Sequence, residues 1–136
     1  MKIQWGRVVL AALVIEAVLG VTFIRLGPII SRAFGFRVYL IFEGIFGFVV
    51  AFLVTIWLAR KIQSHVVLHG LLIGVMARLP FFGLMVAAGT LTRFIKSRGA
   101  VWFWLAQVLG IVATVLGARV CEMKRPDRAK ESVEVT

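Results

Sequence analysis

Long apolar runs separated by short polar stretches make up most of the chain. An α-helix rises about 1.5 Å per residue, so about 20 apolar residues cross a hydrocarbon core of ~30 Å. Four runs approach or exceed that length. The pattern predicts an all-α fold, an integral membrane four-helix bundle formed by residues 1–120, with spans at about 8–24, 38–59, 66–91 and 101–118.

The ends of these runs carry breaking and charged residues. Gly27 and Pro28 follow the first run, and this pair favours the end of a helix. We expect the apolar and basic residues 29–37 to lie at the membrane interface. Residues 121–136 are rich in charge, which predicts a disordered cytoplasmic tail.

Composition supports a membrane location. Apolar residues form 61% of the chain and charged residues 16%, whereas soluble domains hold roughly 25% charged residues. The net charge of +10 lies mostly between the apolar runs, where cations bind anionic lipid headgroups. No basic stripe with exposed aromatics is present, so we expect the lipid bilayer, and not nucleic acid, as the partner of these charges.

The basic residues also bear on orientation. Nine of the 16 Lys and Arg residues fall in the N-terminal segment, the second connection and the tail, and six fall in the first and third connections. Cytoplasmic segments carry the excess of Lys and Arg. We therefore expect a multi-pass protein of the plasma (inner) membrane with both termini in the cytoplasm, although this small bias also allows insertion in both orientations.

The third span contains Arg78 and Pro80, two residues apart. Pro80 has no backbone N–H to donate to the carbonyl of Met76, so we expect a kink in this helix. Interrupted helices at mid-membrane occur at binding sites in transporters and also in inert bundles.

Glu16, Glu43 and Arg78 are the ionisable side chains that fall within the predicted spans, apart from the histidine near the start of the third. Each costs about 2.5–3.5 kcal/mol at a helix centre, which favours pairing among them. Arg78 lies between the two carboxylates in depth and could pair with either or both. The cluster is either a structural lock on helix register or the lining of a polar cavity for a proton, a cation or an amphiphile. Two acids against one base would leave one carboxylate to bind a proton.

Small residues recur at helical spacing on the last two spans. Gly70 and Gly74 form a G-x-x-x-G pattern, and Ala106, Gly110 and Thr114 form a ridge at four-residue spacing. Such residues let helix backbones approach closely. They predict close packing within the bundle and, more weakly, a face for self-association.

His65 and His69 share one face of the third span. Two histidines in this spacing are weak candidates for a metal site, because a third ligand is not evident. We expect them to bond to headgroups or backbone carbonyls, with a single axial bond from His69 to a haem or pigment as a further alternative. No motif of a known enzyme class is present, so we expect neither enzymatic activity nor a cofactor.

The stretch Leu10–Glu16 resembles the first helix of the small multidrug resistance family. That family consists of four-helix proton antiporters with a glutamate at mid-membrane, so the resemblance implies a coupling role for Glu16. The surroundings of Glu43 and of Arg78 depart from the family's pattern. The sequence thus favours an accessory, assembly or self-associating subunit with a homo-oligomeric or membrane-protein partner, and its alternative is a proton-coupled carrier or channel.

Overall fold

The computed structural model describes residues 3–62 and 65–124, and nearly all of them are helical. The helices are α1 (Trp5–Phe34), α2 (Phe36–Ala59), α3 (Val66–Met76), α4 (Leu79–Ala87), α5 (Leu91–Arg98) and α6 (Ala100–Met123). Four stretches are long and apolar enough to cross a membrane: α1, α2, α3 together with α4, and α6. No strand occurs among the described residues. The prediction of an all-α, multi-pass membrane bundle is confirmed.

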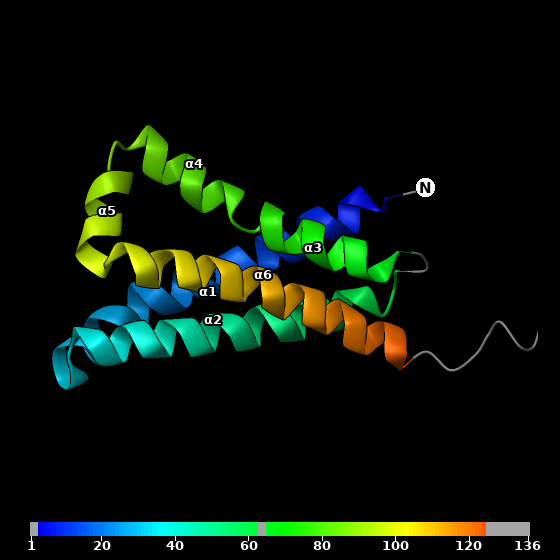
Figure 1. The fold of residues 1–136 in the computed structure, drawn as a ribbon, viewed down its shortest axis with the longest axis horizontal. Coiled ribbons are helices and arrows are strands. Elements are labelled where there is room, and N and C mark those ends of the chain that lie inside the picture. The colour runs from blue at the N-terminus through cyan, green and yellow to red at the C-terminus, as the bar shows by residue number, and fades with distance from the viewer. Residues whose placement is uncertain (1–2, 63–64, 125–136) are drawn as a thin grey trace, which may run out of the picture.

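The bundle has two distinct ends (Figure 1). The start of α1, the end of α6 and the turn between α2 and α3 lie at one end, which we call the terminal end. The turn between α1 and α2 lies at the other, together with α4 and α5. We call this the connection end.

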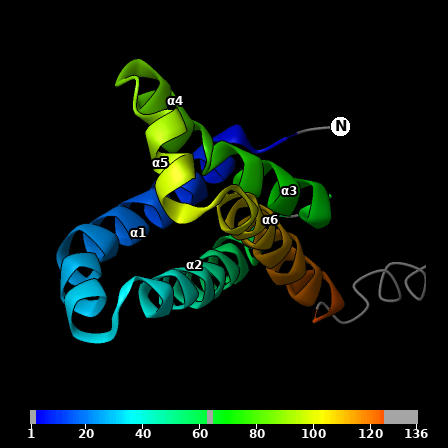
Figure 2. The same cartoon turned by 60° about the vertical axis from the view of Figure 1, so that its left-hand side comes forward.

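The first helix is longer than predicted. α1 continues through Gly27 and Pro28 to Phe34, so the expected break after the first span is wrong, and residues 29–34 are helical. A single missing hydrogen bond at Pro28 is tolerated, and the Cβ-free face of Gly27 is covered by the ring of Tyr39. Gly35, with φ of +88°, then reverses the chain into α2. Figure 2 shows the last part of α1 bending toward α2.

The third span is interrupted, as Pro80 predicts. α3 ends at Met76, Ala77 and Arg78 form a turn, and α4 begins at Leu79 with Pro80 in its first turn. Proline suits that position because the first N–H groups of a helix have no intrahelical acceptor. The kink is therefore a break between two helices, and Arg78 lies in it.

The segment before the last span is also helical. α5 occupies most of the predicted third connection, and Gly99, with φ of +81°, joins it to α6. α6 extends to Met123, so residues 121–123 belong to this helix and not to the tail. The expectation of a disordered tail otherwise falls on residues 125–136, which lie outside the described residues.

Packing is uneven along the bundle. The buried core lies toward the terminal end and includes Val8, Ala11 and Ile15 of α1 with Leu58 of α2 and Ile73 of α3. By contrast, α4 and α5 contribute no buried residue. Figure 1 shows α4 diverging from α6, with α5 leading back to it. The connection end is therefore splayed, and we call α4 and α5 (residues 79–98) the arm.

Candidate functional site

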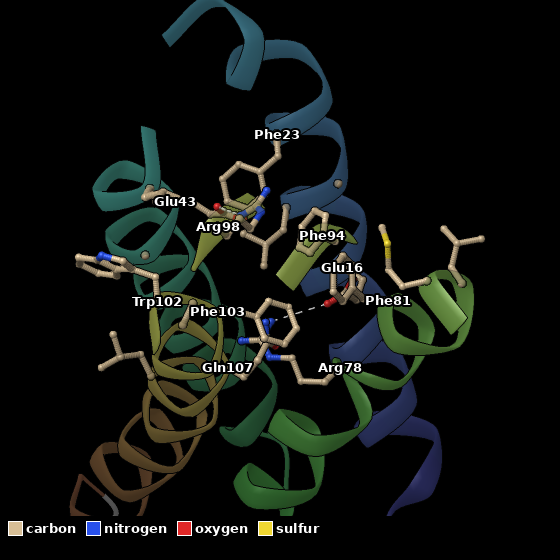
Figure 3. A pocket seen from close by; sticks show the side chains of 18 of the residues that line it. Glu16, Phe23, Glu43, Arg78, Phe81, Phe94, Arg98, Trp102, Phe103 and Gln107 are labelled. Carbon is tan, nitrogen blue, oxygen red and sulfur yellow. Dashed lines mark hydrogen bonds and ion pairs between the residues drawn. The ribbon is translucent and has the colours of Figure 1, made fainter. Parts of the chain in front are cut away.

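A cavity of about 490 Å³ lies in the splayed half of the bundle (Figure 3). Its wall is formed by the middle of α1, the first half of α2, the break at Arg78, the arm and the first half of α6. Most of its lining is apolar or aromatic, and Glu16, Glu43, Arg78 and Arg98 also face it. This volume lies within the roughly 300–1,000 Å³ range of small-molecule sites.

The break in the third span places Arg78 beside Glu16 of α1. The distance between Arg78 Nη1 and Glu16 Oε1 is 3.9 Å, with the side chains 16% and 22% exposed. This distance satisfies an ion pair but exceeds that of a hydrogen bond. The predicted neighbours are therefore brought together, but they are held loosely.

Glu43 has a different partner from the one expected. Its carboxylate accepts a hydrogen bond from Arg98 of α5, and the two form an ion pair. Arg98 Nη2 also donates to the hydroxyl of Tyr39 at 3.4 Å, and the guanidinium lies 4.1 Å from the centroid of the Phe94 ring. The cavity thus holds two acidic and two basic side chains. The expectation of one carboxylate in excess is wrong, because Arg98 is a second base in the cavity.

Sequence reasoning placed Arg98 in a connection at the headgroups. The available signal was local: Phe94 and Arg98 are four residues apart, and they share one face if this segment is a helix. Arg98 and Glu43 are far apart in the sequence and lie on different helices, so their pairing required the tertiary arrangement.

Arg78 lies directly across Gly110 of α6. A Cβ at Gly110 would overlap the Arg78 guanidinium, so only glycine leaves room for this side chain as it stands. Arg78 Nε and Gln107 Oε1 are both buried without a hydrogen-bond partner. Gln107 is three residues before Gly110 on the same helix and also lines the cavity. The cavity lining therefore holds one unused donor, Arg78 Nε, and one unused acceptor, Gln107 Oε1.

The remaining small residues of the predicted packing set have separate roles. Gly70 and Gly74 of α3 pack on Thr114 and Ala118 of α6, so the two predicted small-residue ridges meet each other within one chain. We call this contact between α3 and α6 the small-residue seam. Ala106 lies apart from it and lines the cavity. The seam closes the terminal half of the bundle.

His69 is buried and holds the N-terminal segment to α3. Its Nδ1–H donates to the carbonyl of His65 at 2.9 Å, and its Nε2 accepts from the backbone N–H of Gln4 at 3.0 Å. Both ring nitrogens are therefore occupied. His65 itself is the residue before α3 and has φ of +49°. Within the described part of the chain, no three His, Cys, Asp or Glu side chains gather into a metal site.

The site is thus an apolar cavity with two acid–base pairs, one tight and one loose. It has the features needed to hold a polar head and an apolar tail and to take up a proton on a carboxylate. No family model, curated protein or solved structure matches this chain.

Proposed function

We propose that the protein binds an amphiphilic small molecule inside the membrane and acts as a proton-coupled carrier or channel for it. The observation that supports this most directly is the cavity of about 490 Å³, which combines an apolar wall with four charged side chains. A purely structural ion-pair cluster would not require empty space beside it. The splayed arm would give a ligand access from the surrounding lipid.

The alternative is an accessory or self-associating subunit that acts through helix packing. The small-residue seam suggested this function, but Gly70 and Gly74 face Thr114 and Ala118 of the same chain. A partner would therefore have to use another face. The oligomeric state in mild detergent tests this alternative, which predicts a stable dimer or a higher species.

We also propose that the membrane is the plasma (inner) membrane and that both termini face the cytoplasm. The excess of basic residues toward the terminal end supports this orientation. In it, the cavity opens in the outer half of the bilayer. Labelling of single cysteines placed in residues 60–65 and 89–90 of cells tests the orientation, and labelling of both sites from outside would indicate dual insertion.

The binding test uses Trp102, which lines the cavity, as a fluorescence probe. In a variant with the other three tryptophans replaced by Phe, amphiphiles with a brominated chain should quench Trp102 in a saturable manner. A variant that retains only Trp57, which lies near the terminal end of α2 and outside the cavity lining, should show only non-saturable quenching from the lipid phase.

A matched pair of glycines distinguishes the cavity from the general lipid surface. Gly44 lines the cavity and Gly47 does not, and a Cβ added to either glycine would meet no neighbouring atom within 4 Å. Gly44→Leu should abolish saturable quenching, whereas Gly47→Leu should leave it unchanged. Equal quenching in both variants, or none in the parent, would contradict the proposed function.

A further inference from the structure

The contacts of Arg78 indicate which class of ligand the cavity binds and which ion is coupled to it. This inference rests on the function proposed above. We propose that the cavity takes an anionic amphiphile with a carboxylate or phosphate head. Its head binds Arg78 in place of Glu16, and Glu16 takes up a proton in exchange.

Arg78 is the less engaged of the two cationic side chains that line the cavity. Its guanidinium is mostly buried, lies 3.9 Å from Glu16 and has a buried Nε without a partner. Arg98 is engaged by Glu43, Tyr39 and Phe94. A guanidinium presents a planar set of N–H donors that fits a carboxylate or phosphate with two parallel hydrogen bonds. An anionic head would supply the acceptors that Arg78 lacks.

The surroundings of the cavity favour an anion over a cation. Every charged residue in the stretches 17–42 and 79–100, which form the connection end, is basic. Arg25, Arg32, Arg37, Arg93 and Lys96 of these stretches lie at least partly exposed. A mouth of one charge sign concentrates ligands of the opposite sign. The amide of Gln107, whose Oε1 is buried and unpartnered, can rotate to donate its NH₂ group to the same head.

The apolar wall fits the remaining part of such a ligand. Leu19 and Phe23 of α1 and Leu84 and Met85 of α4 all line the cavity. An acyl chain would bury apolar surface against these side chains and could extend toward the lipid between α1 and the arm. A compact inorganic anion would leave this wall without contacts. We therefore expect the anionic head to belong to an amphiphile.

Proton uptake follows from the charge balance. The charged and titratable groups that face Glu16 are Arg78 at the helix break and, farther away, the pair of Glu43 with Arg98 and Tyr39. Once a bound anion occupies Arg78, Glu16 has no counter-charge in a site of low dielectric constant, which favours its neutral form. A proton from water then binds a Glu16 carboxylate oxygen. One anion and one proton enter together, and the net charge of the cavity is unchanged.

The experiment compares brominated amphiphiles of one chain length that differ in the head: carboxylate, phosphate, alcohol and quaternary ammonium. It measures quenching of Trp102 in nanodiscs of uncharged lipid and proton uptake with a pH indicator in weak buffer. We expect the two anions to bind at least roughly 10-fold tighter than the alcohol. We also expect uptake of about one proton per bound anion. Inorganic phosphate added as a competitor should not displace them.

Three variants separate the contributions. Arg78→Met should remove the preference for anions, whereas Arg119→Met, which removes the same charge from an exposed position at the terminal end of α6, should retain it. Glu16→Gln should bind the anions and lose the proton uptake, which also excludes other titrating groups as its source. Circular dichroism and the saturable binding of the alcohol show whether each variant is folded.

The outcomes distinguish this inference from the function beneath it. If none of the probes binds saturably, the proposed function itself is overturned. Saturable binding with no preference for anions, or with a preference for the ammonium head, would overturn the assigned ligand class alone. Displacement by inorganic phosphate would assign the site to a free anion instead of an amphiphile. Anion binding with proton uptake that persists in Glu16→Gln would overturn the exchange at Glu16.

Discussion

Two arginines in one cavity show how the surroundings of a side chain decide its role. Arg98 is held by a carboxylate, a hydroxyl and an aromatic ring, and it ties α5 to α2. Arg78 lies 3.9 Å from its carboxylate and retains an unpartnered Nε. We therefore interpret the first pair as structural and the second as the exchangeable one.

A double-mutant cycle tests the structural pair. Arg98→Met leaves Glu43 mostly buried without its counter-ion and should lower the free energy of unfolding by about 2–3 kcal/mol. The double variant with Glu43→Gln leaves no buried charge without a partner. The coupling energy between the two substitutions should therefore be at least about 1 kcal/mol. Unfolding in mixed SDS micelles provides the measurement. Arg93→Met is the control, and additive effects of the two changes would contradict the pairing.

At the scale of single residues, the helical period indicates the face and the depth of a residue along its span. This limited what the sequence could predict about its partners. Depth along a span placed Arg78 between Glu16 and Glu43, because helices of known rise cross the same hydrocarbon core, and Arg78 pairs with Glu16. The partner of Glu43 could not be found in this way. Arg98 reaches Glu43 because α5 leads from α4 back to the start of α6, which packs against α2.

At the scale of helices, the same kind of signal succeeded once and failed once. Pro80 predicted an interruption, and the third span is divided there into α3 and α4. Gly27 and Pro28 predicted an end, but α1 continues because Tyr39 packs on Gly27 and one lost hydrogen bond is tolerated. A proline in the sequence shows only that one backbone N–H donor is missing. Whether the helix stops depends on what packs around it.

The small-residue seam gives a prediction at this scale. A Cβ added at Gly70 would lie 2.5 Å from Ala118 Cβ and 2.7 Å from the carbonyl oxygen of Thr114, which cannot move without shifting α6. Gly70→Ala should therefore lower the free energy of unfolding by about 1–3 kcal/mol. Gly47→Ala is the matched control, since no neighbouring atom lies within 4 Å of its added Cβ. It should be neutral or stabilise by up to roughly 1 kcal/mol. Equal stability of the two variants would contradict the seam.

At the scale of the whole molecule, the chain divides into a packed half and a splayed half. Buried residues of α1, α2, α3 and α6 form the core toward the terminal end, whereas the arm contributes none. The contacts that retain the arm include the packing of Phe82 and Phe94 on Phe103 of α6 and the ion pair of Arg98 with Glu43 of α2. Regions with few buried contacts open at low free energy. A carrier needs such a region beside its cavity.

The division predicts a difference in motion that spin labels can measure. In a Cys121→Ser background, labels at the exposed positions Leu84 of α4 and Ile41 of α2 report on the arm, and labels at Leu13 of α1 and Leu116 of α6 report on the packed half. We expect a broader distance distribution for the arm pair, because few contacts beyond the aromatic packing and the ion pair restrain it. Arg98→Met should broaden the arm distribution further and leave the core distribution unchanged. Distributions of equal width in both pairs would mean that the arm is as rigid as the core, and a ligand would then need another route to the cavity.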